Sequence, residues 1–417
     1  MKILIIGAGI TGLTTALSLK AVGFSPVVYE AVANPAPLGV GINILPHAMR
    51  EFTELGLLPK LRTAGVEIDS LRYLTRHGRE IWREARGLAA GYRWPQIAIH
   101  RGRLQMILLD AVIDQLGPES VRFGHALCDV ALHDDHVTAS FVDRTTGQSI
   151  GAERGDVLLA ADGIHSAVRQ KFYPNEGRPI WNQITLWRST VQAPRGDFGR
   201  AMLWAGHSRQ KFVCYPIATS EPGEVLLNWI CDLKGEGSET PAPEDWNKRG
   251  DPEALARAFD GWRWPNVDVP GIVRASREIF EFPMVDRDPL SRWTFGRVTL
   301  LGDAAHPMYP IGSNGATQGV IDARALAFHL ATCPDPEAAL ARYEASRREA
   351  TAKIVMMNRA QGPDRVMDIA EARAPRPDDD LDALFPWGER AEIAAEYKRV
   401  AGFDPQALNA QKSYSLI

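Results

Sequence analysis

Lys2-Ile-Leu-Ile-Ile6, followed at once by Gly7-Ala-Gly-Ile-Thr-Gly12, is the stretch that decides the fold class of this chain. The aliphatic run predicts a buried strand, and Leu13, Ala16 and Leu17 recur at helical spacing directly after the glycines. In this order, the first glycine permits a tight turn, the second lets the backbone approach a pyrophosphate, and the third allows close helix–strand packing. We therefore expect a dinucleotide site.

A second apolar run, Pro26-Val-Val-Tyr-Glu30, predicts the next strand of the same unit and ends in an acid. A carboxylate at this position accepts hydrogen bonds from ribose hydroxyls and repels a 2′-phosphate. FAD or NAD is therefore favoured over NADP as the nucleotide held here. The alternative is a glycine turn that only links a strand to a helix.

The whole chain has 417 residues, which is too many for one hydrophobic core and predicts two domains. Its net charge of −4 gives no basic surface for nucleic acid or anionic lipid, so we expect a small-molecule partner. Four scattered cysteines without CxxC spacing fit reduced thiols in the cytoplasm. The apolar start lacks a basic leader region, and no apolar run approaches the roughly 20 residues of a membrane span.

Two later strands also end in polar, glycine-containing turns. Asp156–Ala161 leads into Asp162-Gly163, and Arg297–Leu301 leads into Gly302-Asp303. Such positions lie at the carboxyl ends of parallel strands, where open α/β sheets bind ligands. After Asp303, a glycine-rich loop precedes a helix, so its N–H groups would stabilise negative charge, as on a reduced flavin. The alternative is an ordinary crossover with an incidental aspartate.

Two further segments read as cofactor contacts. Gly39-Val-Gly-Ile-Asn-Ile44 contains two close glycines, which allow main chain to pass beside something flat, although a simple linker would also use them. Arg101 stands at the start of a predicted helix, where a cation is poorly placed unless an anion is nearby. We expect a phosphate or flavin contact there, with a surface arginine as the alternative.

Residues 173–285 change character and carry many aromatic side chains in strand-like runs. They predict an antiparallel sheet that could form one wall of an aromatic pocket, although such side chains also serve as core. The predicted fold is α/β: a Rossmann-like domain with a parallel or mixed sheet, an antiparallel-sheet substrate domain and a C-terminal helical arm. The first domain takes residues 1–70, 101–172 and 286–360, the second takes 71–100 and 173–285, and the arm takes 361–417.

Two motifs could suggest a metal site or a hydrolase nucleophile, but their sequence context does not support either function. His133-Asp-Asp-His136 lies between two alternating segments and reads as a hairpin turn, so no metal site is expected there. Ser166 lacks the GxSxG context of a hydrolase nucleophile.

Taken together, the motif with Glu30, the Asp162-Gly163 segment and the Gly302-Asp303 segment resemble the flavin-dependent aromatic hydroxylases of the para-hydroxybenzoate hydroxylase group. The resemblance covers nearly the whole chain and is weakest after about residue 365. Within the group, the chain looks most similar to the phenazine-carboxylate (5-methylphenazine-1-carboxylate 1-monooxygenase) branch. The segments that carry this likeness are Gly39–Ile44, Asp162–Arg169, Phe282–Pro289 and Gly302–Gly315.

The resemblance implies a single-chain monooxygenase that binds FAD, takes hydride from NADH or NADPH, and reacts with O₂. A flavin C4a-hydroperoxide would then hydroxylate a planar aromatic or N-heteroaromatic ring, such as a phenazine- or pyridine-carboxylate. A flavin dehydrogenase or oxidase without oxygen insertion, and a non-catalytic flavoprotein, remain as alternatives. A flavin halogenase is disfavoured because the chain has no Trp-x-Trp-x-Ile-Pro segment. The assembly could be a monomer or a homodimer.

The expected site needs no covalent or acid–base catalytic side chain, because the cofactor carries the chemistry. The resemblance implies that Glu30 binds the adenosine ribose, that Arg101 and Asp303 bind the FAD backbone, and that Asp162 lies near the pyrophosphate and the nicotinamide entry side. The full set of expected cofactor contacts is Gly7, Gly9, Ile10, Thr11, Gly12, Glu30, Ala31, Val40, Gly41, Arg101, Leu127, Asp162, Gly163, Gly302, Asp303, Gly315 and Ala316.

Other side chains are expected at the flavin ring and the substrate. The flavin-positioning loop is expected to use Pro307, Gly312, Asn314 and Gly315. The expected substrate contacts are Trp187, Tyr215, Trp229, Met308, Tyr309 and Pro310, with His100, Arg188 and His306 as possible polar partners that could equally be structural.

Overall fold

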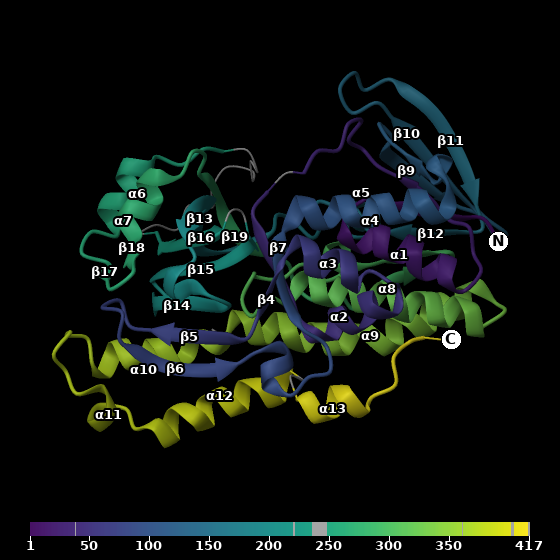
Figure 1. The fold of residues 1–417 in the computed structure, drawn as a ribbon. Helices are drawn as coiled ribbons and strands as arrows, with labels where there is room; N and C mark the ends of the chain where they lie inside the picture. Colours follow the sequence, from purple (N-terminus) through teal and green to yellow (C-terminus); the bar gives the residue numbers. More distant parts are fainter. Residues whose placement is uncertain (38, 220–221, 236–247, 361, 402–403, 416–417) are drawn as a thin grey trace.

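The computed structural model describes residues 1–37, 39–219, 222–235, 248–360, 362–401 and 404–415. One part of the molecule is built around the N-terminal strand, and a second part is built around a large twisted sheet (Figure 1). The C-terminal helices run along one side of both parts (Figure 1). The predicted α/β fold class is confirmed.

A six-stranded sheet forms the centre of the first part, in the order β20-β21-β12-β1-β2-β8. Its strands are parallel except for the edge strand β20. Strands β1 and β12 are buried at every position, as all-aliphatic sequences require when both faces of a parallel sheet are covered. The strand bounds are β1 Ile3–Ile6, β2 Val27–Tyr29, β8 Val121–Arg122, β12 Val157–Ala160, β20 Thr294–Phe295 and β21 Val298–Leu300.

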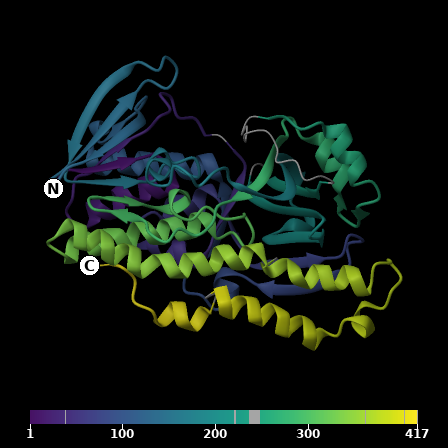
Figure 2. The ribbon, with the colours of Figure 1, turned by 180° about the vertical axis from the view of Figure 1, so that it is seen from behind.

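Helices cover one face of this sheet, and a small antiparallel sheet covers the other. Helix α1 packs against both α4 and α8, and α9 runs beside α8 (Figure 2). On the opposite face, Phe141 of β10 stacks on Tyr29 of β2 with ring centroids 4.5 Å apart. The predicted hairpin turn at residues 133–136 is confirmed, since it joins β9 to β10. The bounds are α1 Ile10–Ala21, α2 Pro46–Glu54, α3 Leu58–Ala64, α4 Arg101–Leu116, α5 Ala167–Phe172, α8 Gly315–Thr332, α9 Pro336–Arg359, β9 Ala126–Leu132, β10 Val137–Val142 and β11 Ser149–Gly155.

A seven-stranded sheet forms the second part, in the order β19-β13-β16-β15-β14-β5-β6. Its neighbours are antiparallel as expected, with one correction: β5 pairs with β14 in parallel, so the sheet is mixed. This pairing arises because β5 comes from a distant excursion of the chain and no hairpin joins it to β14. The bounds are β5 Ser70–Leu74, β6 Glu80–Ala85, β13 Ile180–Pro194, β14 Ala201–His207, β15 Gln210–Thr219, β16 Glu224–Lys234 and β19 Phe280–Asp286.

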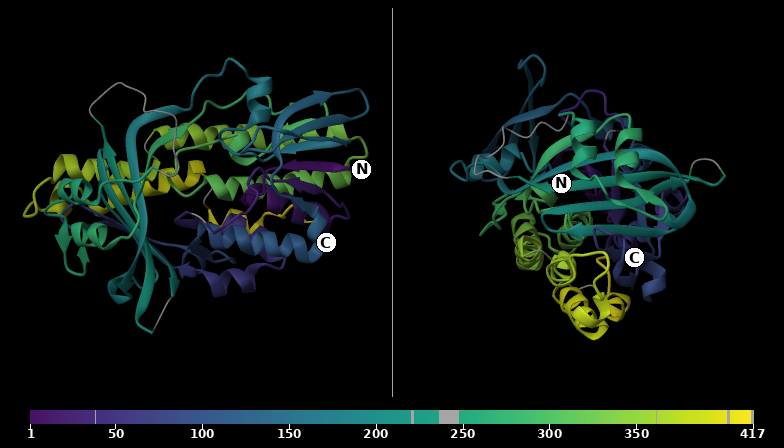
Figure 3. Two further views of the ribbon diagram at one scale, coloured as in Figure 1. Left: turned by 90° about the horizontal axis from the view of Figure 1, so that it is seen from above. Right: turned by 90° about the vertical axis from the view of Figure 1, so that its left-hand side faces the viewer.

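The two faces of the seven-stranded sheet have different neighbours, because successive side chains of a strand point to opposite faces. One face packs under α6, α7 and the short β17–β18 ribbon, as the end-on view shows (Figure 3). The other face meets the C-terminal helices and the small sheet β3-β7-β4, which lies between the two parts. The bounds are α6 Pro252–Ala258, α7 Val269–Ala275, β17 Arg263–Trp264, β18 Val267–Asp268, β3 Gly41–Ile44, β4 Val66–Ile68 and β7 Gln96–His100.

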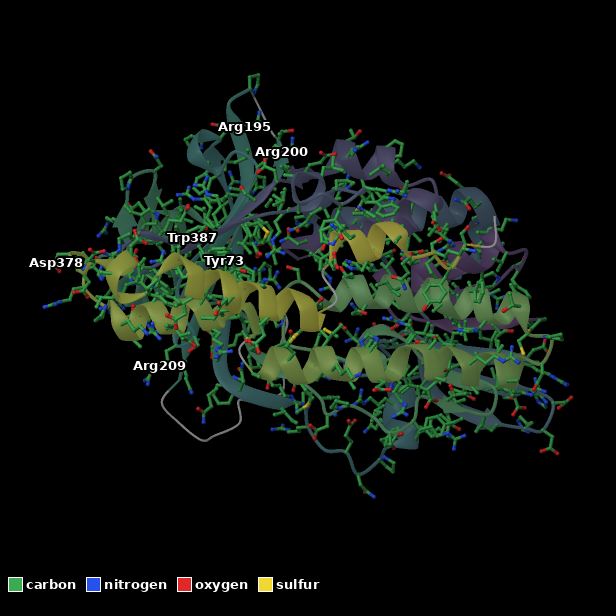
Figure 4. All side chains as sticks on the ribbon, turned by 90° about the horizontal axis from the view of Figure 1, so that it is seen from below. Tyr73, Arg195, Arg200, Arg209, Asp378 and Trp387 are labelled. Carbon is green, nitrogen blue, oxygen red and sulfur yellow. The ribbon has the colours of Figure 1, made fainter. Side chains whose placement is uncertain are left out.

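The C-terminal arm is helical, as predicted. Its helices are α10 Arg365–Arg373, α11 Leu381–Leu384, α12 Trp387–Ala401 and α13 Pro405–Ala410. Phe385 and Tyr73 of β5 belong to one buried cluster, while Trp387 packs on Trp82 of β6. Figure 4 shows Tyr73 and Trp387 beside the C-terminal helices. No helix of the described residues is long and apolar enough to span a bilayer. The predicted domain boundaries stay a prediction.

Candidate functional site

The glycine turn after β1 has the geometry that its sequence demands. Gly7 has φ of +99°, and a Cβ there would lie 2.5 Å from the carbonyl oxygen of Ala161. A Cβ at Gly12 would lie 1.9 Å from the oxygen of Gly7. By contrast, no described protein atom lies within 4 Å of the Cβ position at Gly9. Gly7 and Gly12 therefore serve packing, whereas Gly9 faces open space where another group can come close.

Side chains from β2 and α4 hold this turn in place. Glu30 accepts hydrogen bonds from the backbone N–H of Ala8 at 2.7 Å and of Val32 at 2.8 Å. Gln105 of α4 donates to the oxygen of Ala8 at 2.8 Å. The contact of Glu30 with a ribose stays a prediction. Sequence reasoning missed Gln105, since nothing in the sequence near position 105 marks a contact with a turn almost a hundred residues earlier.

The turn after β12 contains a half-buried carboxylate with one oxygen that has no hydrogen-bond partner among the described residues. Asp162 Oδ2 accepts from the N–H of Ala167 at 2.9 Å, while its buried Oδ1 has no hydrogen-bond partner among the described residues. Burial raises the pKa of Asp162 above its usual value. Gly163, at φ +79°, leaves open space beside it. This turn can accept a hydrogen bond from a ligand.

Arg169 ties that turn to the turn after β21. Its guanidinium is almost fully buried and donates to the carbonyl oxygens of Ala304 and Ala305 at 3.1 and 3.0 Å. It also pairs with Glu176. Two turns from distant parts of the chain are thus held at one edge of the sheet. The role of Arg169 was not predicted, although it ends the Asp162–Arg169 segment.

The turn after β21 presents Asp303 at the surface, beside the start of α8. The short helix η4 (Gly302–Ala304) packs so closely on α1 that a Cβ at Gly302 would lie 2.6 Å from Thr11 Oγ1. Asp303 keeps solvent-exposed surface, yet desolvation raises the pKa of its carboxyl. Asp303 Oδ1 also lies 3.8 Å from the Cβ position of Gly315, at the start of α8.

A buried ionic network that includes side chains of α8 and α9 stabilises η4. Asp322 of α8 accepts from the N–H of Gly302 at 3.1 Å and from Arg347 at 2.8 Å, and it pairs with His306. Burial alone would raise the pKa of Asp322, but the charges of His306 and Arg347 outweigh it and lower the pKa to about 2. His306 is thus buried against Asp322, which gives it a structural role. Nothing local to Asp322 or Arg347 in the sequence marks either residue.

The loop from Pro307 to Asn314 has strained backbone at its end. Gly312 and Ser313 have φ of +71° and +59°, and a non-glycine residue in this region is unusual. Asn314 is fully buried, and neither atom of its amide has a partner among the described residues. Because buried amides are nearly always hydrogen-bonded, Asn314 is suited to meet a polar ligand at the start of α8.

Two side chains anchor the same loop. Tyr309 packs with Leu186 of β13 and Phe282 of β19, while Met308 packs against Ile354 and Val355 of α9. Tyr309 therefore faces the seven-stranded sheet. Met308 faces α9, away from that sheet.

Arg101 lies between both parts of the molecule. It begins α4, and its backbone N–H donates to the oxygen of Val40 at 2.9 Å. Its positive charge opposes the rise that desolvation causes in the pKa of Asp303, and it helps to lower the pKa of Arg188 of β13. Since Asp303 and Arg188 belong to different parts, Arg101 stands where they meet. The positive charge of two neighbouring guanidinium groups there suits an anionic ligand.

The face of the seven-stranded sheet that meets β3 is polar at its centre. Arg188 donates to the oxygen of Gly41 at 2.8 Å, and Asn228 accepts from the N–H of Gly41 at 2.7 Å. Tyr215 lies on the same face of the sheet, where the positive charge of Arg188 opposes the rise that burial causes in its pKa. Arg188 Nε and Asn228 Nδ2 are buried without a partner within the described residues. This face can therefore donate further hydrogen bonds to a ligand.

Trp187 and Trp229 lie on the opposite face, which corrects their expected role. Trp229 is fully buried beneath α7, where its indole donates to Ser276 at 2.8 Å. Trp187 packs in the same cluster and donates to Glu281 at 3.1 Å. Strand alternation puts them a full sheet thickness away from Arg188 and Tyr215. They are core residues, and Tyr215 alone of the three expected sheet aromatics stays a candidate substrate contact.

The remaining predicted residues occupy varied positions. Ile10, Thr11 and Ala316 lie in the first turns of α1 and α8, Ala31 follows β2, and Leu127 lies in β9. Pro307 is buried, Pro310 is exposed, and His100 ends β7 with its pKa lowered by burial. The described residues contain no group of three metal-ligating side chains.

The donor set fits FAD. Open space at Gly9, the spare oxygen of Asp162 and the unpartnered amide of Asn314 all lie on the turns that the motifs mark. N–H groups at the starts of α1 and α8 would face phosphate and the flavin ring respectively. Which individual residues contact the cofactor stays a prediction.

Comparisons with known proteins agree. The family model described as "FAD binding domain" matches residues 1–358. The phenazine 1,6-dicarboxylic acid hydroxylase PhzS of Lysobacter antibioticus is 41% identical over 95% of this chain and 96% of its own. The 3-hydroxybenzoate 6-hydroxylase 1 of Aquipseudomonas alcaligenes is 31% identical over 86% of this chain and 88% of its own.

Solved structures show the same architecture. The Klebsiella pneumoniae protein HpxO, crystallised with FAD and uric acid, has a TM-score of 0.74 and 25% identity over 98% of this chain and 96% of its own. A variant of HpxO crystallised with FAD gives a TM-score of 0.75 at 25% identity, over 97% of this chain and 100% of its own. The chain belongs to the family of FAD-dependent aromatic hydroxylases, as its resemblance implied.

Proposed function

We propose that the protein is a single-component monooxygenase that hydroxylates a planar aromatic or N-heteroaromatic acid at the expense of NAD(P)H and O₂. One observation carries the proposal. The segment Val40–Gly41 connects the turns that fit FAD to the polar face around Arg188, because the backbone N–H of Arg101 donates to the oxygen of Val40 and Arg188 donates to the oxygen of Gly41. A cofactor and a ring substrate could therefore lie against each other.

When bound, FAD supplies hydride acceptance and oxygen activation, and the polypeptide supplies position and electrostatics. Gly9 would admit the pyrophosphate, and Glu30 would accept from the adenosine ribose. The start of α8 would stabilise negative charge on the reduced ring, because its N–H groups and helix dipole favour an anion. Pro307, Gly312 and Asn314 would fix the loop against that ring.

The polypeptide would also orient the substrate. Arg188 is a planar donor that suits a carboxylate, and Tyr215 beside it can hold a polar atom of the ring. The apolar side chains of Tyr309, Ile311 and Phe282 would exclude water, which limits unproductive oxygen chemistry. A phenazine- or pyridine-carboxylate combines the flat ring and the acid that this lining favours. Relatives named for phenazine, hydroxybenzoate and hydroxynicotinate substrates support this class.

The decisive experiment is purification followed by a substrate-stimulated oxidation assay. We expect a yellow protein whose NAD(P)H consumption increases with a heteroaromatic acid, and whose product carries ¹⁸O from labelled O₂. Turnover without label would instead indicate a dehydrogenase or oxidase. Flavin binding without stimulated consumption by any ring compound would indicate a non-catalytic flavoprotein.

A further inference from the structure

A buried charge cluster lies on the same face of the seven-stranded sheet as Arg188. Lys211 of β15 pairs with Asp232 of β16 at 3.1 Å and also with Asp364, at the end of η5 (Gly362–Asp364). The three side chains are 9%, 5% and 4% exposed. Asp364 belongs to the C-terminal arm, so the arm contributes directly to the interior of this sheet face.

The cluster leaves two carboxylate oxygens unused. Each carboxylate accepts from Lys211 with its Oδ2, while Oδ1 of Asp232 and Oδ1 of Asp364 are buried without a partner in the described part of the chain. Burial raises the pKa of both carboxyls, and Lys211 opposes that rise. The charge of Asp364 adds to the rise for Asp232, and the charge of Asp368 adds to it for Asp364. Leaving a buried acceptor unsatisfied is costly, so such oxygens are normally met by a partner.

Asp232 borders the region where a ring substrate would lie. It stands directly opposite Leu186 in the β13–β16 register, and Ile230, two residues earlier, stands opposite Arg188. Leu186 packs on Tyr309 and Ile311 of the loop before α8. The charges of Asp232 and Arg188 also act on each other's pKa. Asp232 and Arg188 thus lie near each other, and Asp232 can accept hydrogen bonds whereas Arg188 can donate them.

We propose that Asp232 is a specificity-determining residue: its free oxygen accepts a hydrogen bond from a hydroxyl, an N–H or an un-ionised carboxyl on the substrate ring. Lys211, which is also bound by Asp364, orients the carboxylate of Asp232. The preferred substrate then carries a hydrogen-bond donor in addition to the group held by Arg188. This inference rests on the proposed function and narrows its substrate class.

Matched ring compounds test the proposal in the FAD-loaded full chain. The probes are 3-hydroxybenzoate against 3-methoxybenzoate and 1-hydroxyphenazine against 1-methoxyphenazine, since each methoxy compound accepts but cannot donate. Flavin absorbance titration gives Kd, and NAD(P)H oxidation gives KM and kcat. We expect the wild type to bind the hydroxyl member about ten- to a hundredfold more tightly, as for loss of one hydrogen bond to a buried charged group. Equal affinity within both pairs would overturn the proposal.

Asp232→Asn replaces the hydrogen-bond acceptor that would face the ring with a donor. Lys211 can only donate, so the amide oxygen must face Lys211 and the amide N–H₂ must face the ring. The preference for the hydroxyl member is therefore expected to vanish or reverse, mainly through Kd and KM. Asp364→Asn is the matched control, because it removes the same charge from Lys211 without bordering the ring. It is expected to keep the wild-type preference even if both affinities fall.

The outcomes separate two failures. If no ring compound perturbs the flavin or stimulates oxidation in the wild type, the proposed function fails and this inference falls with it. If ring compounds bind but Asp232→Asn keeps the wild-type preference, or Asp364→Asn loses it equally, only the inference is overturned. If Asp232→Asn does not retain FAD, the difference in Kd between the hydroxyl and methoxy compounds in the wild type still tests the inference.

Discussion

At the scale of single residues, Gly9 and Gly12 belong to one motif but have different roles. Gly12→Ala would place a Cβ 1.9 Å from a backbone oxygen, so we expect a loss of about 3 kcal/mol or more of stability. Gly9→Ala meets no described protein atom within 4 Å, so its apo stability should change by less than about 0.5 kcal/mol. Thermal unfolding of the apo proteins distinguishes the two.

The same pair tests the nucleotide site. If the pyrophosphate binds in the open space beside the Gly9 backbone, Gly9→Ala should weaken FAD binding about tenfold or more, which is roughly 1.4 kcal/mol. Fluorescence titration of apo protein with FAD measures this directly. Wild-type affinity in the folded Gly9→Ala variant would contradict the assignment.

Asp322 makes a pH-dependent contribution. Its pKa of about 2 lies below the ordinary 3.8, so its stabilisation is fully present above about pH 4 and is lost as pH falls through 2. Asp322→Asn should cost about 3–5 kcal/mol at pH 7, because it breaks a buried ionic network. The difference from wild type in urea unfolding should shrink between pH 4 and pH 2. Glu349→Gln, which breaks an exposed pair with Lys353, is the control and should change little. A difference that stays constant with pH would contradict this account.

Residue identities predicted some of these roles and not others. The turn at Gly7–Gly12 could be predicted because strand, glycines and helix are contiguous in sequence. Trp229 and Tyr215 could not be told apart, since which face of a sheet meets the cofactor depends on long-range packing. Asp322 and Arg347 carry no local signal, because their partners lie far away in sequence.

At the scale of elements, Arg359 joins α9 to β19. At the end of α9 it donates two hydrogen bonds to Asp286 of β19, at 2.7 and 2.9 Å. Arg359→Met should cost about 3–5 kcal/mol because it leaves the Asp286 carboxylate buried and unpaired.

A double-mutant cycle tests whether the unpaired Asp286 carboxylate causes this loss of stability. Adding Asp286→Asn to Arg359→Met should recover part of the lost stability in chemical denaturation, since the uncompensated charge is removed. Arg365→Met removes an exposed pair with Glu396 and serves as the control. Strictly additive losses would show that the two side chains act independently. The existence of α9 and β19 could be predicted from their patterns, but their connection could not.

At the scale of the whole molecule, the C-terminal arm completes the core on one face of the seven-stranded sheet. Phe385 is 0% exposed among arm and sheet side chains, while its neighbour Leu384 is 44% exposed. Phe385→Ala should lower the free energy of unfolding by about 3–5 kcal/mol, and Leu384→Ala by less than about 1 kcal/mol. Because Phe385 belongs to a cluster separate from that around the glycine turn, both variants should keep wild-type FAD affinity once folded. Equal destabilisation by the two substitutions would contradict the packing described for the arm.

The central place of β1 has a consequence for synthesis. Its neighbour β2 emerges soon after it, but β12 ends at Ala160, and β21 and α8 follow only near residues 298 and 315. At about 5–20 residues per second, a ribosome needs roughly 8–30 seconds to pass from β1 to the end of β12. Through that interval one edge of an all-aliphatic strand is unpaired, so chaperones have time to bind the nascent polypeptide. The sheet is extended beyond β12 only when β21 follows.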